Sequence, residues 1–237
     1  MKKITTLFLI VLLSLTVCKA NYKIEKKINM FGIFKKTDNI EKFWIWFIAN
    51  QSRLRNFQKN PDKYLTEVLS QIKKIKNGLA IEFEPPKNNI IGMTISADGD
   101  RNLFEIVQKI VSKAPEISGW KIIAFRQRMD LEEFTKIKLE AEGQKLEPDK
   151  MKFFPVIQGD TLDIIIYSKG INEKNFNQIA YGGLILLDNI LGEYDCVMKV
   201  RSYDFQNLPT KKEELEGLQP LIDLAKYVDN FHKTIKH

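Results

Sequence analysis

Two aspartates and two arginines are the residues whose types and spacing could form a binding site. Asp98 and Asp100 directly follow one apolar run of the chain, and Arg126 and Arg128 end another. If these runs are parallel strands joined by a helix, their carboxyl ends meet at one sheet edge, where ligands often bind in open α/β sheets. Two guanidinium groups on one strand face could grip a carboxylate, phosphate or sulfate group. We therefore predict a ligand-binding site at Asp98, Asp100, Arg126 and Arg128.

These four residues also have a purely structural interpretation. Asp98 or Asp100 would then cap the helix that follows by accepting hydrogen bonds from its first backbone N–H groups. The arginines would pair with those carboxylates or lie in solvent, where ion pairs contribute little to stability. Helix capping therefore stays open as the alternative to ligand binding.

The residues that common catalytic mechanisms need are scarce in this chain. His232 and His237 are its only histidines, and their spacing does not match the pair on one face that a zinc-binding helix uses. The sequence contains no phosphate-binding glycine motif, no nucleophile elbow and no calcium-binding loop. We therefore predict no cofactor and no metal site, and we assign no catalytic residue.

Carboxylates leave one enzymatic alternative. Two carboxylates with neighbouring arginines could perform the acid–base hydrolysis of a glycan, as glycosidases do. A deep cleft that holds Asp98 or Glu84 beside a second carboxylate would favour such an envelope hydrolase. A shallow face with capped aspartates would favour a binding module.

The first 20 residues have the pattern of a secretion signal. Lys2 and Lys3 precede an uncharged apolar run, and Cys18 and Ala20 are small residues at the two positions that signal peptidase inspects. The apolar run is near half of the about 20 residues that a membrane-spanning helix needs. We therefore predict cleavage after Ala20 and a mature protein in the periplasm or the medium.

Cys18 carries a second interpretation, because residues 15–18 loosely match a bacterial lipoprotein box. In that alternative Cys18 is lipidated and anchors the chain to the envelope. Val17 argues against it, since that position normally holds Gly, Ala or Ser. Membrane association would require this lipidation or an uncleaved signal.

The charge of the mature chain is a mild basic excess. Removal of Lys2, Lys3 and Lys19 with the signal leaves 34 of the 37 basic residues against 30 acidic ones. Lysines and glutamates are interleaved, without the basic stripe and stacking aromatic residues that nucleic-acid binding requires. We expect no nucleic-acid partner, while an anionic small molecule or an envelope polymer remains a candidate ligand.

The apolar pattern predicts an α+β fold in which one order of elements occurs twice. Each time, two strands are followed by a helix and a third strand. The predicted elements are the strands 79–84 and 90–96, the helix 102–113 and the strand 120–128, and then the strands 151–157 and 161–168, the helix 174–191 and the strand 194–203. These tandem units, about 60–130 and 131–237, resemble ferredoxin-like modules with a largely antiparallel sheet and helices on one face.

Other segments complete the predicted organisation. Residues 21–39 are interpreted as a polar linker, and residues 40–237 as a single body, because each unit alone offers little core. The aromatic cluster at 43–47 suits either a buried strand or a core helix. Residues 136–140 predict an extra strand, and Pro220 begins a last helix.

Three segments resemble an uncharacterised bacterial protein family. They are residues 43–47 (FWIWF), 95–99 (ISADG) and 120–128 (WKIIAFRQR). The resemblance covers residues 42–203 and implies no activity and no catalytic residue. The sequence as a whole predicts an exported binding or scaffolding module of unknown ligand, with the small envelope hydrolase as the alternative.

Overall fold

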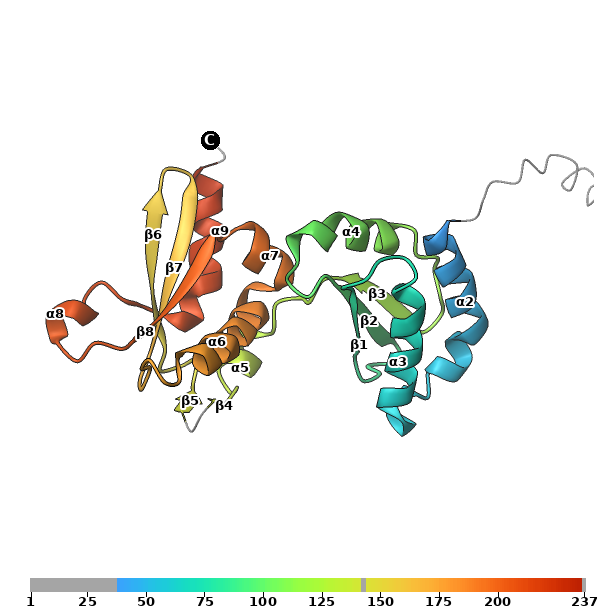
Figure 1. Ribbon diagram of the computed structural model, residues 1–237, viewed down its shortest axis with the longest axis horizontal. Helices are drawn as coiled ribbons and strands as arrows, with labels where there is room; N and C mark the ends of the chain where they lie inside the picture. The colour runs from blue at the N-terminus through green and yellow to red at the C-terminus, as the bar shows by residue number, and fades with distance from the viewer. Residues whose placement is uncertain (1–37, 142–143, 236–237) are drawn as a thin grey trace, which may run out of the picture. The chain divides into compact units, whose positions relative to one another are not determined.

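The computed structural model describes residues 38–141 and 144–235 (Figure 1). The predicted signal peptide, Cys18 and nearly all of the predicted linker lie outside these residues. Asn39–His237 belong to one compact unit. Among the described residues, no helix combines the length and apolar character needed to cross a membrane.

The N-terminal half of this unit is a three-stranded sheet covered by helices. Its sheet has the order β1-β2-β3, in which β2 is antiparallel to β1 and parallel to β3. The elements are α2 (Asn39–Leu54), η2 (Phe57–Lys59), α3 (Pro61–Ile72), β1 (Ala80–Phe83), β2 (Ile91–Ser96), η3 (Arg101–Leu103), α4 (Phe104–Ser112) and β3 (Trp120–Ala124).

The aromatic cluster at 43–47 lies within helix α2 and anchors the first core. Phe43, Trp44 and Phe47 are buried, and the Phe47 and Trp120 rings meet edge to face at 5.0 Å between centroids. The indole N–H of Trp44 donates to the Ile110 carbonyl at 3.0 Å, which satisfies its polar atom inside the core. These contacts give the cluster a packing role.

The C-terminal half has a second sheet and a second core. Strand β7 is antiparallel to β6 and parallel to β8, and β9 extends the sheet beyond β6. The elements are α5 (Leu131–Phe134), β4 (Leu139–Ala141), β5 (Gln144–Leu146), β6 (Lys152–Gln158), β7 (Thr161–Ser168), α6 (Phe176–Leu191), α7 (Glu193–Met198), β8 (Ser202–Asn207), α8 (Lys212–Leu215), β9 (Gln219–Pro220), η4 (Leu221–Asp223) and α9 (Leu224–Thr234). Helices α6 and α9 contribute to its core.

The predicted α+β class is confirmed. The order strand, strand, helix, strand occurs in both halves as β1-β2-α4-β3 and as β6-β7-α6-β8, with α7 added before β8. In both sheets the first pair is antiparallel and the second pair is parallel, so the sheets are mixed. The closer resemblance to a ferredoxin-like module stays a prediction.

Two predicted strands have other bounds in the structure. Residues 194–203 form helix α7 and the start of β8, because Gly192, at φ 72°, ends α6 and lets a new helix begin. The strand predicted over 120–128 ends at Ala124, and Phe125 has a φ of 64°. This left-handed residue takes Arg126 and Arg128 out of the strand, so the shared strand face predicted for them does not form.

Two smaller predictions also need correction. The extra strand predicted over 136–140 begins at Leu139 as β4, which pairs with β5 in a two-stranded sheet. Pro220 belongs to the short strand β9, and the last helix, α9, begins at Leu224 after one 3₁₀ turn.

Candidate functional site

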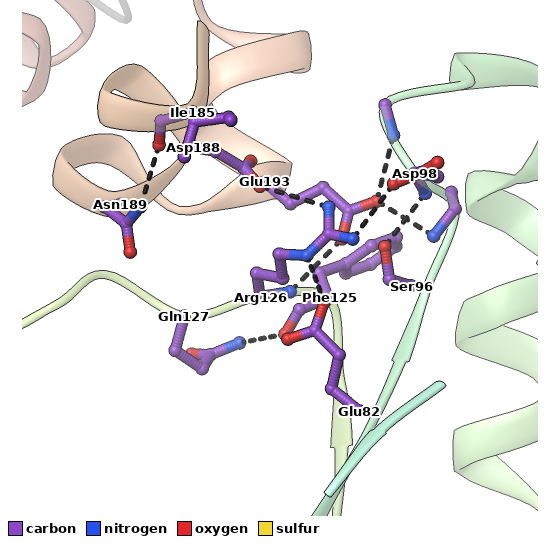
Figure 2. Close-up of polar contacts among 12 residues, drawn as sticks. Glu82, Ser96, Asp98, Phe125, Arg126, Gln127, Ile185, Asp188, Asn189 and Glu193 are labelled. Carbon is purple, nitrogen blue, oxygen red and sulfur yellow. Dashed lines mark hydrogen bonds and ion pairs between the residues drawn. The ribbon is translucent and has the colours of Figure 1, made fainter. Parts of the chain in front are cut away.

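Arg126 lies at the centre of a carboxylate cluster (Figure 2). Its Nε donates to Glu82 of β1, its Nη2 to Asp98 at 2.9 Å, and its Nη1 to Asp188 of α6 at 3.1 Å. Burial acts to lower the pKa of Arg126, but hydrogen bonds to Glu82 and Asp98 outweigh it and hold this pKa above its ordinary value. We call Arg126, Glu82, Asp98 and Asp188 the Arg126 cluster.

Asp188 is the most sheltered carboxylate of the Arg126 cluster. Its side chain is 22% exposed, compared with 49% for Glu82 and 67% for Asp98. Burial raises the pKa of Asp188, and Arg126 only partly offsets this effect. Because it is the least exposed carboxylate of this cluster, the ionised form of Asp188 should be the one that a nearby positive charge stabilises most.

Glu193, at the start of α7, is a fully buried carboxylate that holds the ends of two strands of the first sheet. It accepts hydrogen bonds from the backbone N–H groups of Ala97 at 2.8 Å, Gly99 at 3.3 Å and Arg126 at 3.2 Å. Its own N–H donates to the Arg126 carbonyl at 3.0 Å. These backbone donors compensate for the burial of its charge.

Asp100 and Arg128 lie outside the Arg126 cluster. Asp100 accepts from the backbone N–H of Asn102 at 2.9 Å and caps η3, which is the structural role considered for it. Arg128 donates to Asp229 at 2.7 and 2.8 Å and also bonds to Asp195. The structure thus brings Asp98 and Arg126 together and directs Asp100 and Arg128 elsewhere.

A cleft of about 780 Å³ opens beside the Arg126 cluster. Helix α6 contributes an exposed apolar face, in which the exposed fractions are 71% for Tyr181, 45% for Leu184 and 40% for Ile185. Asp188 lies one turn further along the same face, because positions three and four apart are neighbours on a helix. The cleft therefore combines an apolar wall with a charged end.

Other groups that line the cleft offer little reactivity. Burial raises the pKa of Cys196 to about 11, so its thiol stays protonated near neutral pH and is a weak nucleophile. Arg201 pairs with Asp163 and also donates to Gln158 at 3.1 Å. Within residues 38–141 and 144–235, no group of three or more His, Cys, Asp or Glu side chains could hold a metal ion.

Sequence analysis missed three of the carboxylates around Arg126. Glu82 lies in a short strand, Asp188 is the one charged residue of the apolar helix α6, and Glu193 follows a glycine that ends a helix. A lone acidic residue in an apolar helix was an available signal for Asp188. No protein-family model, curated protein or solved structure matches the chain.

Proposed function

We propose that this protein is an exported binding module whose ligand occupies the cleft beside α6. The observation that carries this proposal is the exposed face of Tyr181, Leu184 and Ile185, which leads to the convergent charges of the Arg126 cluster. Small-molecule sites commonly combine an apolar wall with a few placed polar groups in about 300 to 1,000 Å³. Export rests on the predicted signal in residues 1–20.

Ligand-dependent stabilisation tests the cleft as the binding site. We would screen envelope glycans, short peptides and small amines for compounds that raise the melting temperature, since a ligand that binds only the folded protein stabilises it. Ile185→Arg places a charge on the apolar wall, and Ile157→Arg makes the same change at an exposed position of β6. The hits should stabilise the wild type and Ile157→Arg but not Ile185→Arg. A screen without hits would contradict the proposal. Hits that raise the melting temperature of Ile185→Arg as much as that of the wild type would also contradict it.

Fractionation of the native host tests export. An intact mass that places the N-terminus at Asn21, in the periplasm or the medium, would support it. A full-length chain in the cytoplasm would overturn it. A chain that begins at a diacylated Cys18 would instead support the lipid-anchored alternative.

A second candidate function is the envelope hydrolase, because Asp98 lines a cleft beside Asp188. The raised pKa of Asp188 suits a general acid, and Glu82 or Asp98 would then serve as the base. However, Asp188 accepts a hydrogen bond from Arg126, which favours the ionised form of Asp188 and weakens it as an acid. Cleavage of an envelope glycan by the wild type but not by Asp188→Asn would favour the hydrolase. Binding without turnover would favour the module.

A further inference from the structure

We infer that the cleft binds a hydrophobic amine, in which a protonated amino group is joined to a compact apolar body. This inference rests on the proposed function, since it names the ligand class for the same cleft. Three observations carry it: the balance of charge at the charged end of the cleft, the engagement of Arg126 by carboxylates, and the position of the apolar wall.

The balance of charge in the Arg126 cluster is negative. Three carboxylates, those of Glu82, Asp98 and Asp188, share the single guanidinium of Arg126. The buried carboxylate of Glu193 lies next to them, and its hydrogen-bond donors within the described residues are backbone N–H groups. A ligand cation would therefore gain attraction at this end of the cleft, whereas an anion would be repelled.

Arg126 has little capacity to bind an anionic ligand. All three nitrogens of its guanidinium already donate to carboxylates. Arg201, the second arginine on the cleft, is engaged by Asp163 and Gln158. An anion would therefore meet two guanidinium groups whose charge is already offset by carboxylates. We therefore expect a cationic ligand, and not the carboxylate, phosphate or sulfate group that the sequence suggested for Arg126 and Arg128.

The apolar wall sets the size of the ligand. Leu184 and Ile185 precede Asp188 by four and three positions, so the apolar surface begins about one helical turn, roughly 5 Å, from the carboxylate. Val197 and Val200 also line the cleft. An amine two carbons away from an aromatic ring spans this distance. The exposed ring of Tyr181 could also stack on the ligand's ring or contact its ammonium group.

Three probes with the same ring and different charges test the inference. They are 2-phenylethylamine, 2-phenylethanol and 3-phenylpropanoate, each titrated against the full chain at low salt and followed by NMR shift changes. The amine should bind about tenfold more tightly than the alcohol, as a charge-assisted hydrogen bond to a sheltered carboxylate provides. The carboxylate probe should bind most weakly, and added salt should reduce the preference for the amine.

Variants assign that preference to the cluster. Asp188→Asn should remove most of the amine's advantage and leave the affinity for the alcohol unchanged. Asp160→Asn, at an exposed turn between β6 and β7, is the matched control and should change neither affinity. If Asp188→Asn fails to fold, Glu82→Gln at a half-exposed position repeats the test.

The outcomes separate this inference from the proposed function. Equal binding of the three probes, or tightest binding of 3-phenylpropanoate, overturns the amine ligand while the cleft remains a binding site. If no probe binds but the wider screen finds a ligand that Ile185→Arg blocks, the inference again fails alone. If neither the probes nor the screen finds binding, both fail.

Discussion

The loss of the buried Glu193 carboxylate should destabilise this fold. Glu193→Ala would leave the backbone N–H groups of Ala97, Gly99 and Arg126 without their acceptor inside the protein. Because unsatisfied buried donors cost about 1 to 3 kcal/mol each and the site can partly relax, we expect a loss of about 3 kcal/mol. Urea unfolding measures it, and Glu105→Ala, at an exposed position of α4, is the control. Equal stabilities of the two variants would contradict this role.

Asp229 should make stability depend on pH. The hydrogen bond from Arg128 holds the pKa of Asp229 well below its usual range, and burial only partly opposes it. Because the folded pKa is lower than the unfolded value of about 3.9, the ionised group stabilises the fold above about pH 4. This contribution is lost as the pH falls through the folded pKa.

Asp229→Asn tests that dependence. The wild type should be about 1 to 2 kcal/mol more stable than the variant at pH 7, a range reduced because the Asp229 side chain is one-third exposed. The difference should shrink below pH 4. Urea unfolding at pH 7, 5 and 3 measures it, and a difference that stays constant over this range would argue against the ion pair as its source.

At the scale of elements, Gly183 sets how closely α6 packs against β8. A Cβ atom at this buried position would lie 2.1 Å from a ring carbon of Phe205. Alanine favours a helix over glycine by about 1 kcal/mol, but the overlap should outweigh it. We therefore expect Gly183→Ala to destabilise the protein by about 1 to 3 kcal/mol.

A double variant distinguishes overlap from other causes. Phe205→Leu removes the ring that the new methyl group would meet. Phe205→Leu should therefore reduce the stability of Gly183→Ala by less than it reduces the stability of the wild type. Urea unfolding of the four proteins gives this coupling. Strictly additive losses, or a more stable Gly183→Ala, would show that close packing is not what requires glycine here.

At the scale of the whole molecule, the question is whether the two cores unfold together. They are separate hydrophobic clusters within the unit Asn39–His237. Arg126 and Glu193 connect the first sheet to α6 and α7. Because each half alone has few strands and little core, we predict a single cooperative unfolding transition for both.

Calorimetry and a fragment test this prediction. One transition with equal calorimetric and van't Hoff enthalpies is expected for the full chain. Residues 60–128 alone should lack dispersed amide signals, because the core contributed by α2 is missing. Two separate transitions, or a folded fragment with its own sharp melt, would show two independent domains.

Local signals in the sequence were sufficient for the class and the order of elements. Asn60 caps α3 by accepting from the Lys63 N–H at 3.2 Å, and Pro61 occupies the first turn, an arrangement that is typical of an Asn-Pro pair at a helix start. The apolar runs became β1, β2, β6 and β7, close to their predicted bounds. Such features depend on neighbours within a few residues, which a linear sequence displays.

Tertiary structure alone decided the composition of the candidate site. Arg126 meets Glu82 and Asp188 across 44 and 62 residues of chain, and no periodicity relates positions so far apart. The left-handed backbone at Phe125 also separates Arg128 from Arg126, although an extended strand would have placed both on one face. From the sequence, Asp98 and Arg126 were expected to meet at one sheet edge only if the two strands before them were parallel, and β2 and β3 are parallel. Packing of two separate cores determined which carboxylates they meet, because that depends on contacts between distant segments.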